Sequence, residues 1–174
     1  MTKFDNKKCY KLNENQLIGF LGGNMIMKYE VSKGTLAIVP NEEMNSLVYE
    51  DDQRYLIQDS PFHIMEESCK YFGSTYEGRK NGAREILGAE YKVPIVVEDS
   101  DNLIVFPTTS PLADDCVWIS LKRVKNIEKI DNNTTKVIFD NNLELIVDCS
   151  YRTMENQLSR ASRLDLILRN HKNS

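Results

Sequence analysis

Residues 60–82 read SPFHIMEESCKYFGSTYEGRKNG, and this stretch separates two groups of predicted strands. Ser60 followed by Pro61 is a typical helix start, with serine as the N-cap and proline at the first helical position. Apolar side chains then recur at spacings of three and four, which places them on one helical stripe: Phe62, Met65, Cys69 and Phe72. Gly73 is expected to end the helix. The stretch therefore predicts one central helix, followed by a glycine-rich loop.

Two hairpins are predicted on the N-terminal side of this helix. Apolar and charged residues alternate over 25–31, a turn follows at 32–34, and residues 35–40 form the return strand. A second hairpin fits the segments SLVYE and RYLIQ, which flank Asp51-Asp52.

Strands and a second helix are predicted on the C-terminal side. The apolar or alternating segments are 91–97, 102–107, 116–124, 134–139 and 143–147, and Asp140-Asn141-Asn142 has the residue types of a hairpin turn. From about Ser150 to Asn170, an apolar stripe recurs at helical spacing: Met154, Leu158, Ala161, Leu164 and Leu168. We predict an α+β fold with two N-terminal β hairpins, a central helix, further mostly antiparallel strands and a C-terminal helix.

The length of 174 residues suits one globular domain. We expect an N-terminal extension over 1–24, a single α+β domain over 25–170 and a tail over 171–174. Residues 1–16 lack the apolar core of a signal peptide, and no apolar run approaches the roughly 20 residues that span a bilayer. The prediction is a cytoplasmic protein with no membrane partner.

The glycine-rich segment superficially resembles a phosphate-binding loop, G-x-x-x-x-G-R-K. A nucleotide-binding loop needs lysine directly after the second glycine and then serine or threonine, between a strand and a helix. Here Arg79, Lys80 and Asn81 follow Gly78, and the segment follows a helix. We therefore reject nucleotide binding. Binding of another anion and a merely exposed basic turn both remain compatible with the residues.

Catalytic and metal sites find little support. The chain has two histidines, of which His171 lies near the C-terminus, and it has no G-x-S-x-G motif. The four cysteines show neither C-x-x-C spacing nor metal-ligand spacing to histidine: Cys9, Cys69, Cys116 and Cys149. We expect reduced thiols, no metal or other cofactor, and no enzymatic activity.

The net charge of −4 conceals a segregated distribution. Residues 93–121 contain five acidic residues and no lysine or arginine, whereas residues 122–130 and 149–174 each sum to +3. An acidic protein can therefore present a basic surface to nucleic acid, although solvated faces have the same composition.

The segments that identify a family are YEVSKGTLAIVP (29–40), SCKYFGSTYEGRKNG (68–82), KVPIVV (92–97), LIVFPTTS (103–110), CVWIS (116–120) and SYRTMENQ (150–157). Together they make the chain similar to the ComK-type competence transcription factors, from about residue 29 to about residue 168. Residues 1–24 have no recognised counterpart in that family.

The resemblance implies a sequence-specific DNA-binding activator of DNA-uptake genes, which binds A/T-rich boxes largely through the minor groove. Narrow A-tract minor grooves favour inserted arginine, which fits the basic segments. The resemblance also implies a homodimer or a dimer of dimers, with RNA polymerase and a proteolytic adaptor as further partners.

Combining the matched segments with charge gives the candidate DNA-binding residues Lys70, Ser74, Thr75, Arg79, Lys80, Asn81, Arg84, Lys122, Arg123, Arg160 and Arg163. Arg79 and Lys80 are expected on the surface.

Family members extend further at the C-terminus with a basic and aromatic tail. An alternative prediction is therefore a truncated member that acts as a protein-interaction module, dimerising but activating poorly or not at all.

Overall fold

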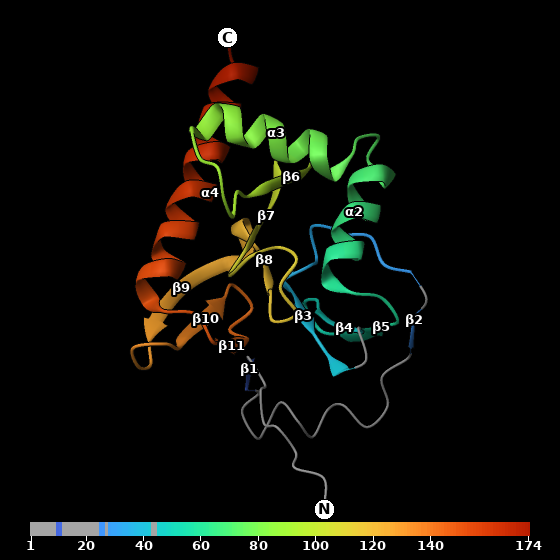
Figure 1. The fold of residues 1–174 in the computed structure, drawn as a ribbon, viewed down its shortest axis with the longest axis vertical. Coiled ribbons are helices and arrows are strands. Elements are labelled where there is room, and N and C mark those ends of the chain that lie inside the picture. Colours follow the sequence, from blue (N-terminus) through green and yellow to red (C-terminus); the bar gives the residue numbers. More distant parts are fainter. Residues whose placement is uncertain (1–9, 12–24, 27, 43–44) are drawn as a thin grey trace, which may run out of the picture.

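The computed structural model describes residues 10–11, 25–26, 28–42 and 45–174, and these residues form two β sheets and three α-helices (Figure 1). The strands of the larger sheet are β2 (Met25–Ile26), β3 (Ala37–Pro40), β4 (Ser46–Tyr49), β5 (Arg54–Ile57), β6 (Ile95–Glu98), β7 (Leu103–Pro107) and β8 (Trp118–Ser120). Their order is β2-β5-β4-β3-β8-β7-β6, and every pair is antiparallel except β2 with β5.

The smaller sheet has the order β1-β11-β10-β9 and is antiparallel throughout. Its strands are β1 (Tyr10–Lys11), β9 (Val124–Lys129), β10 (Thr135–Phe139) and β11 (Glu144–Val147). A 3-10 turn, η3 (Leu121–Arg123), connects β8 of the large sheet to β9.

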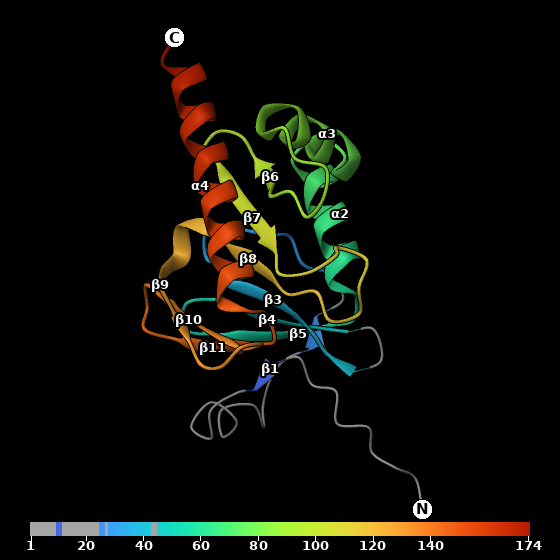
Figure 2. The same ribbon diagram turned by 60° about the vertical axis from the view of Figure 1, so that its left-hand side comes forward.

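The helices α2 (Pro61–Tyr71) and α3 (Tyr76–Leu87) lie on one side of the large sheet, and α4 (Tyr151–Lys172) runs along the other (Figure 2). α4 packs against β7, α3, β9 and η3, so it bridges the two sheets. Met154, Ala161 and Leu164 of its predicted stripe are fully buried, while Leu158 and Leu168 are partly buried. Within the described part of the chain, none of the helices is both long and apolar enough to cross a membrane.

The predicted α+β class, mostly antiparallel strands and C-terminal helix are confirmed. Ser60 caps α2, because its side chain accepts a hydrogen bond from the His63 amide, and Ser150 caps α4 in the same way. The turn between β10 and β11 contains Asn142 in the left-handed region, at φ 64°. Most of the predicted extension over 1–24 lies outside the described residues, and the domain boundaries stay predictions.

The central helical region contains two helices rather than one. The segment predicted as a glycine-rich loop forms α3, with Thr75 as its N-cap and Gly88 as its left-handed C-cap at φ 61°. A glycine inside a helix costs about 1 kcal/mol relative to alanine, which is why Gly78 and Gly82 favoured a loop prediction. The helix forms nonetheless because it buries one apolar stripe beneath it, made of Tyr76, Ala83 and Leu87.

The predicted hairpin of residues 25–31 with 35–40 does not form. β3 pairs with β4 and β8, and β2 lies at the far edge beside β5. The Val31 amide donates to the buried hydroxyl of Ser68 on α2, 3.0 Å away, instead of to a neighbouring strand. Tertiary hydrogen bonding to α2 thus replaces local strand pairing here.

The predicted strand over 116–124 is interrupted. Residues 118–120 form β8, η3 then turns the chain, and β9 begins at Val124 in the other sheet. The interruption matters because it carries the basic residues of η3 and β9 towards α4.

Candidate nucleic-acid interface

The candidate basic residues that the structure places on α2 and α3 are paired with neighbouring carboxylates. Lys70 Nζ lies 2.6 Å from Glu67 Oε1, and Lys80 Nζ lies 3.3 Å from Glu77 Oε1. Arg84 is paired with Glu90 across the end of α3. These three cations therefore add little net positive potential to the surface.

The Arg79 side chain is largely buried and forms an ion pair with the large sheet. Its side chain is 14 % exposed, and its Nη1 lies 2.6 Å from Asp99 Oδ2 in the β6–β7 turn. Burial raises the pKa of the nearby Cys69 thiol to about 11, and the charge of Arg79 opposes that rise. Arg79 thus ties α3 to the large sheet, and the expectation that it lies on the surface is wrong.

The uncharged candidates of this segment serve the helix boundaries. Thr75 Oγ1 accepts the Gly78 amide at 3.0 Å, and the Ser74 amide donates to the Cys69 carbonyl. Asn81 is exposed on α3. With Thr75 already used as the cap and Glu77 in the first turn, the N-terminus of α3 is poorly suited to hold a phosphate.

A groove of about 360 Å³ lies beside α3 and includes Lys80 and Arg84 in its wall. The strongly exposed Tyr91 and Leu112 also line it. Both cations face carboxylates within the same groove, Glu77 and Glu90.

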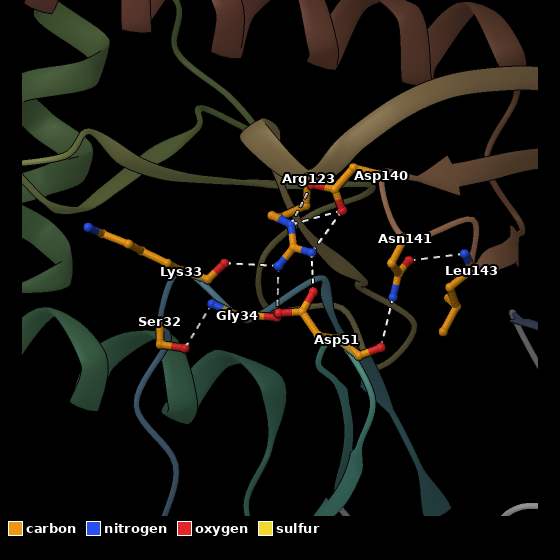
Figure 3. A network of polar contacts seen from close by, with 8 residues as sticks. All are labelled: Ser32, Lys33, Gly34, Asp51, Arg123, Asp140, Asn141 and Leu143. Carbon is orange, nitrogen blue, oxygen red and sulfur yellow. Dashed lines mark hydrogen bonds and ion pairs between the residues drawn. The ribbon is translucent and has the colours of Figure 1, made fainter.

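Arg123 is the centre of a polar network that joins three turns (Figure 3). Its Nε and Nη2 donate to Asp140, Nη2 also donates to Asp51, and Nη1 donates to the carbonyls of Lys33 and Gly34 at 3.0 and 3.2 Å. The Arg123 side chain is 15 % exposed. All of its N–H groups have partners, so Arg123 is a structural clamp rather than a free phosphate ligand.

Of the remaining candidates, Arg160 and Arg163 lie on α4, and Lys122 lies in η3, just before β9. β9 and α4 pack against each other, and both carry basic residues. We name this surface the α4–β9 face and define it by Lys125, Lys129, Arg152, Arg160 and Arg163, all of which are exposed. The two basic segments, separated by about twenty residues in sequence, are therefore adjacent in space.

Backbone hydrogen bonds and the charge of nearby Lys129 lower the pKa of the Asp131 carboxyl, and the other cations of the α4–β9 face make no ion pair with a described residue. Lys125 bonds the amide oxygen of Asn142, and Arg160 bonds the carbonyl of Tyr91 at 3.1 Å and the Gln157 side chain. Among the described residues, Lys129, Arg152 and Arg163 make no ion pair. The positive charge of Arg152 and Arg163 in particular is available to a polyanion.

Acidic residues on the same two elements are few. Glu128 is bound by Lys136, and Asp165 is bound by Arg169, which leaves Glu155. Three members of this face were absent from the sequence-based candidates: Lys125, Lys129 and Arg152. The summed charges of their segments were the signal that could have identified them.

The described residues show neither a metal site nor a reactive thiol. They contain no cluster of three or more histidine, cysteine or acidic side chains that could hold a metal. The three described cysteines are buried and free, and burial raises the pKa of Cys116 to about 12 and also raises that of Cys149. Such thiols are poor nucleophiles at neutral pH.

Comparison with known proteins agrees with the family motifs. The ComK protein family matches residues 26–173. The chain is 35 % identical over 139 residues to the competence transcription factor of Bacillus subtilis (strain 168), which covers 78 % of this chain and 72 % of that relative. No solved structure is significantly similar. The chain therefore belongs to the ComK protein family of competence transcription factors, and not to a family of enzymes.

Proposed function

We propose that the protein is a sequence-specific DNA-binding activator of competence genes and that the α4–β9 face makes its principal contacts with DNA. The observation that carries the proposal is that the two basic segments form neighbouring elements, β9 and α4, of an acidic protein. Lysine and arginine side chains that lack carboxylate partners bind phosphates and release counterions. The relative's description as a competence transcription factor supports the same function.

The length of α4 suits a position along the DNA backbone. Its 22 residues extend for about 33 Å at about 1.5 Å per residue, close to one turn of B-DNA. A helix is too wide for a minor groove of about 6 Å. In our proposal α4 stays outside the groove, and arginine side chains reach into the narrow minor groove of A/T-rich boxes.

Paired half-boxes would be bound by a homodimer or a dimer of dimers, because two linked half-sites raise affinity only when both subunits engage together. RNA polymerase and a proteolytic adaptor remain proposed partners from the family resemblance. The cytoplasm, where the DNA of a bacterium lies, is the proposed location.

We expect at least tenfold tighter binding to a duplex with paired A/T boxes than to a G/C-rich duplex of equal length, because each unsuitable base pair typically costs about 1–3 kcal/mol. Fluorescence anisotropy at several salt concentrations measures both affinities. The affinity for the A/T duplex should fall as salt rises, with a logarithmic slope of about −0.9 for each phosphate contact. Equal affinity for the two duplexes, or binding that is insensitive to salt, would contradict the proposal.

A further inference from the structure

A second cavity lies on the large sheet, next to η3. Its volume is about 280 Å³, and its lining combines two apolar strand residues with polar and charged groups: Lys33, Asp101, Leu103, Ile104, Ser120, Lys122 and Arg123. The cavity has room for several water molecules, each of which occupies about 30 Å³. Three of the charged lining residues are cations and one is an anion.

An acidic turn lies at the edge of this cavity, and basic side chains from several elements converge on it. The turn connects β6 to β7 and has the sequence EDSD over residues 98–101. Lys33 Nζ lies 2.5 Å from Asp101 Oδ2, and Lys122 Nζ donates to the Asp101 carbonyl. From α4, Lys172 Nζ donates to the Asp99 carbonyl and to Asn102 Oδ1.

This arrangement favours an anion at the position of the Asp101 side chain. Lys33 lowers the pKa of Asp101 most, and the charges of Lys122 and Lys172 lower it further. The pKa of Lys33 is raised by the same partner. Only the lowered pKa of Asp101 reports a positive potential, which side chains of separate segments produce at its carboxylate.

The cavity wall also contains a hydroxyl without a partner. Ser120 is 2 % exposed, and its Oγ makes no hydrogen bond with any described residue. A buried hydroxyl is normally hydrogen-bonded, so an acceptor close to this wall would remove a cost. Arg123 adds neither a free donor nor net positive charge, because its N–H groups are already used and two carboxylates balance it.

We propose that this cavity is a phosphate-binding site in which Lys33 and Lys122 are the ligands, and that a phosphate displaces the carboxylate of Asp101 from Lys33. Lys33 is 75 % exposed, so its ion pair is solvated and easily exchanged. A carboxylate and a phosphate oxygen accept the same charge-assisted hydrogen bonds from lysine.

The phosphate has two sources that share this chemistry. One is a phosphodiester of DNA, since η3 connects the cavity to β9 and packs against α4; this source rests on the proposed function. The other is a free phosphate group on a small molecule. We favour DNA, because the cavity would then extend the α4–β9 face by two further cations.

The test uses the full chain with two variants and two controls. Lys33→Gln with Lys122→Gln removes the ligands, and Asp101→Asn removes the competing carboxylate. Lys28→Gln with Lys70→Gln is the matched control for the first variant, because both are exposed lysines paired with glutamates. Asp114→Asn, an exposed loop carboxylate, is the control for the second.

On the A/T-boxed duplex, the Lys33/Lys122 variant should bind several-fold more weakly and reduce the salt slope by about 2, at about 0.9 per lost contact. Asp101→Asn should bind several-fold more tightly than the parent. In a separate arm, melting temperature is measured with inorganic phosphate against chloride at equal ionic strength. A rise with phosphate in the parent that is lost in the Lys33/Lys122 variant, without a change in DNA binding, assigns the site to a free phosphate group.

If the parent binds DNA while both variants match their controls in the DNA and phosphate arms, the phosphate site is wrong. If the parent binds no DNA at any salt concentration, the proposed function fails, and the phosphate arm still decides the site. No response to phosphate in that case overturns the site as well.

Discussion

Replacing Arg123 with alanine is expected to lower the free energy of unfolding by about 2–4 kcal/mol. The reason is the network in Figure 3, in which one nearly buried guanidinium holds Asp51, Asp140 and two backbone carbonyls. Alanine would leave these acceptors without their donor and would separate the turns that they belong to. Urea unfolding followed by circular dichroism measures the change.

Two control variants make the result specific. Lys125→Ala, two residues away and exposed, should change stability by less than about 0.5 kcal/mol. Arg123→Lys keeps the charge but cannot reproduce the planar fork, so an intermediate loss is expected. An Arg123→Ala protein as stable as the Lys125→Ala protein would show that the network does not hold the turns together.

The same network predicts a pH dependence. Arg123 lowers the pKa of Asp140 below its ordinary value. The stabilisation from Asp140 is therefore complete above the unfolded pKa of about 3.9 and is lost as the pH falls through the lower folded value. In the Arg123→Ala protein this part of the acid sensitivity should disappear.

Reversing two charges on α4, Arg152→Glu with Arg163→Glu, is expected to weaken binding to the A/T-boxed duplex by about 100-fold or more. Two phosphate or groove contacts would be lost, and each is worth roughly 1–3 kcal/mol when an arginine reaches a base edge. Two carboxylates would also repel the backbone. Fluorescence anisotropy at a fixed salt concentration measures the loss.

The fold should tolerate this change, because both positions are exposed and Glu at position 152 lies in the first turn of α4, where negative charge is favourable. Lys70→Glu with Lys80→Glu is the matched control, since it makes the same change in net charge at cations that are already paired. Equal losses in the two double variants would show that only overall charge matters and that the α4–β9 face is not the contact surface.

The parts of the fold that could be predicted from sequence are those with local causes. Ser60 with Pro61 and Ser150 mark helix starts through bonds to amides three residues away, and the turn at 140–142 depends on its own residue types. α3 was not predicted because Gly78 and Gly82 favour a loop. Its apolar stripe is sparse, since Tyr76, Ala83 and Leu87 lie seven and four residues apart. The cap at Thr75 and the glycine at position 88 were the available signals.

The candidate site was harder to predict because charge pairing is a property of the folded chain. Lysines and arginines of equal formal charge differ in whether a carboxylate lies beside them. Glu67 and Glu77 are near in sequence, and their pairing with Lys70 and Lys80 follows from helical spacing. The partner of Arg79 in the β6–β7 turn depends on tertiary packing, and so does the meeting of β9 with α4.

The most direct test of the α4–β9 face is site-specific photo-crosslinking to the A/T-boxed duplex. A photoreactive side chain is placed at Asn156, one turn after Arg152 on the exposed side of α4, or at Asn81 on the exposed side of α3. Our account predicts efficient crosslinking from position 156, suppressed by high salt, and little from position 81. Crosslinking from position 81 with none from position 156 would contradict it and return the DNA contact to the glycine-rich helix.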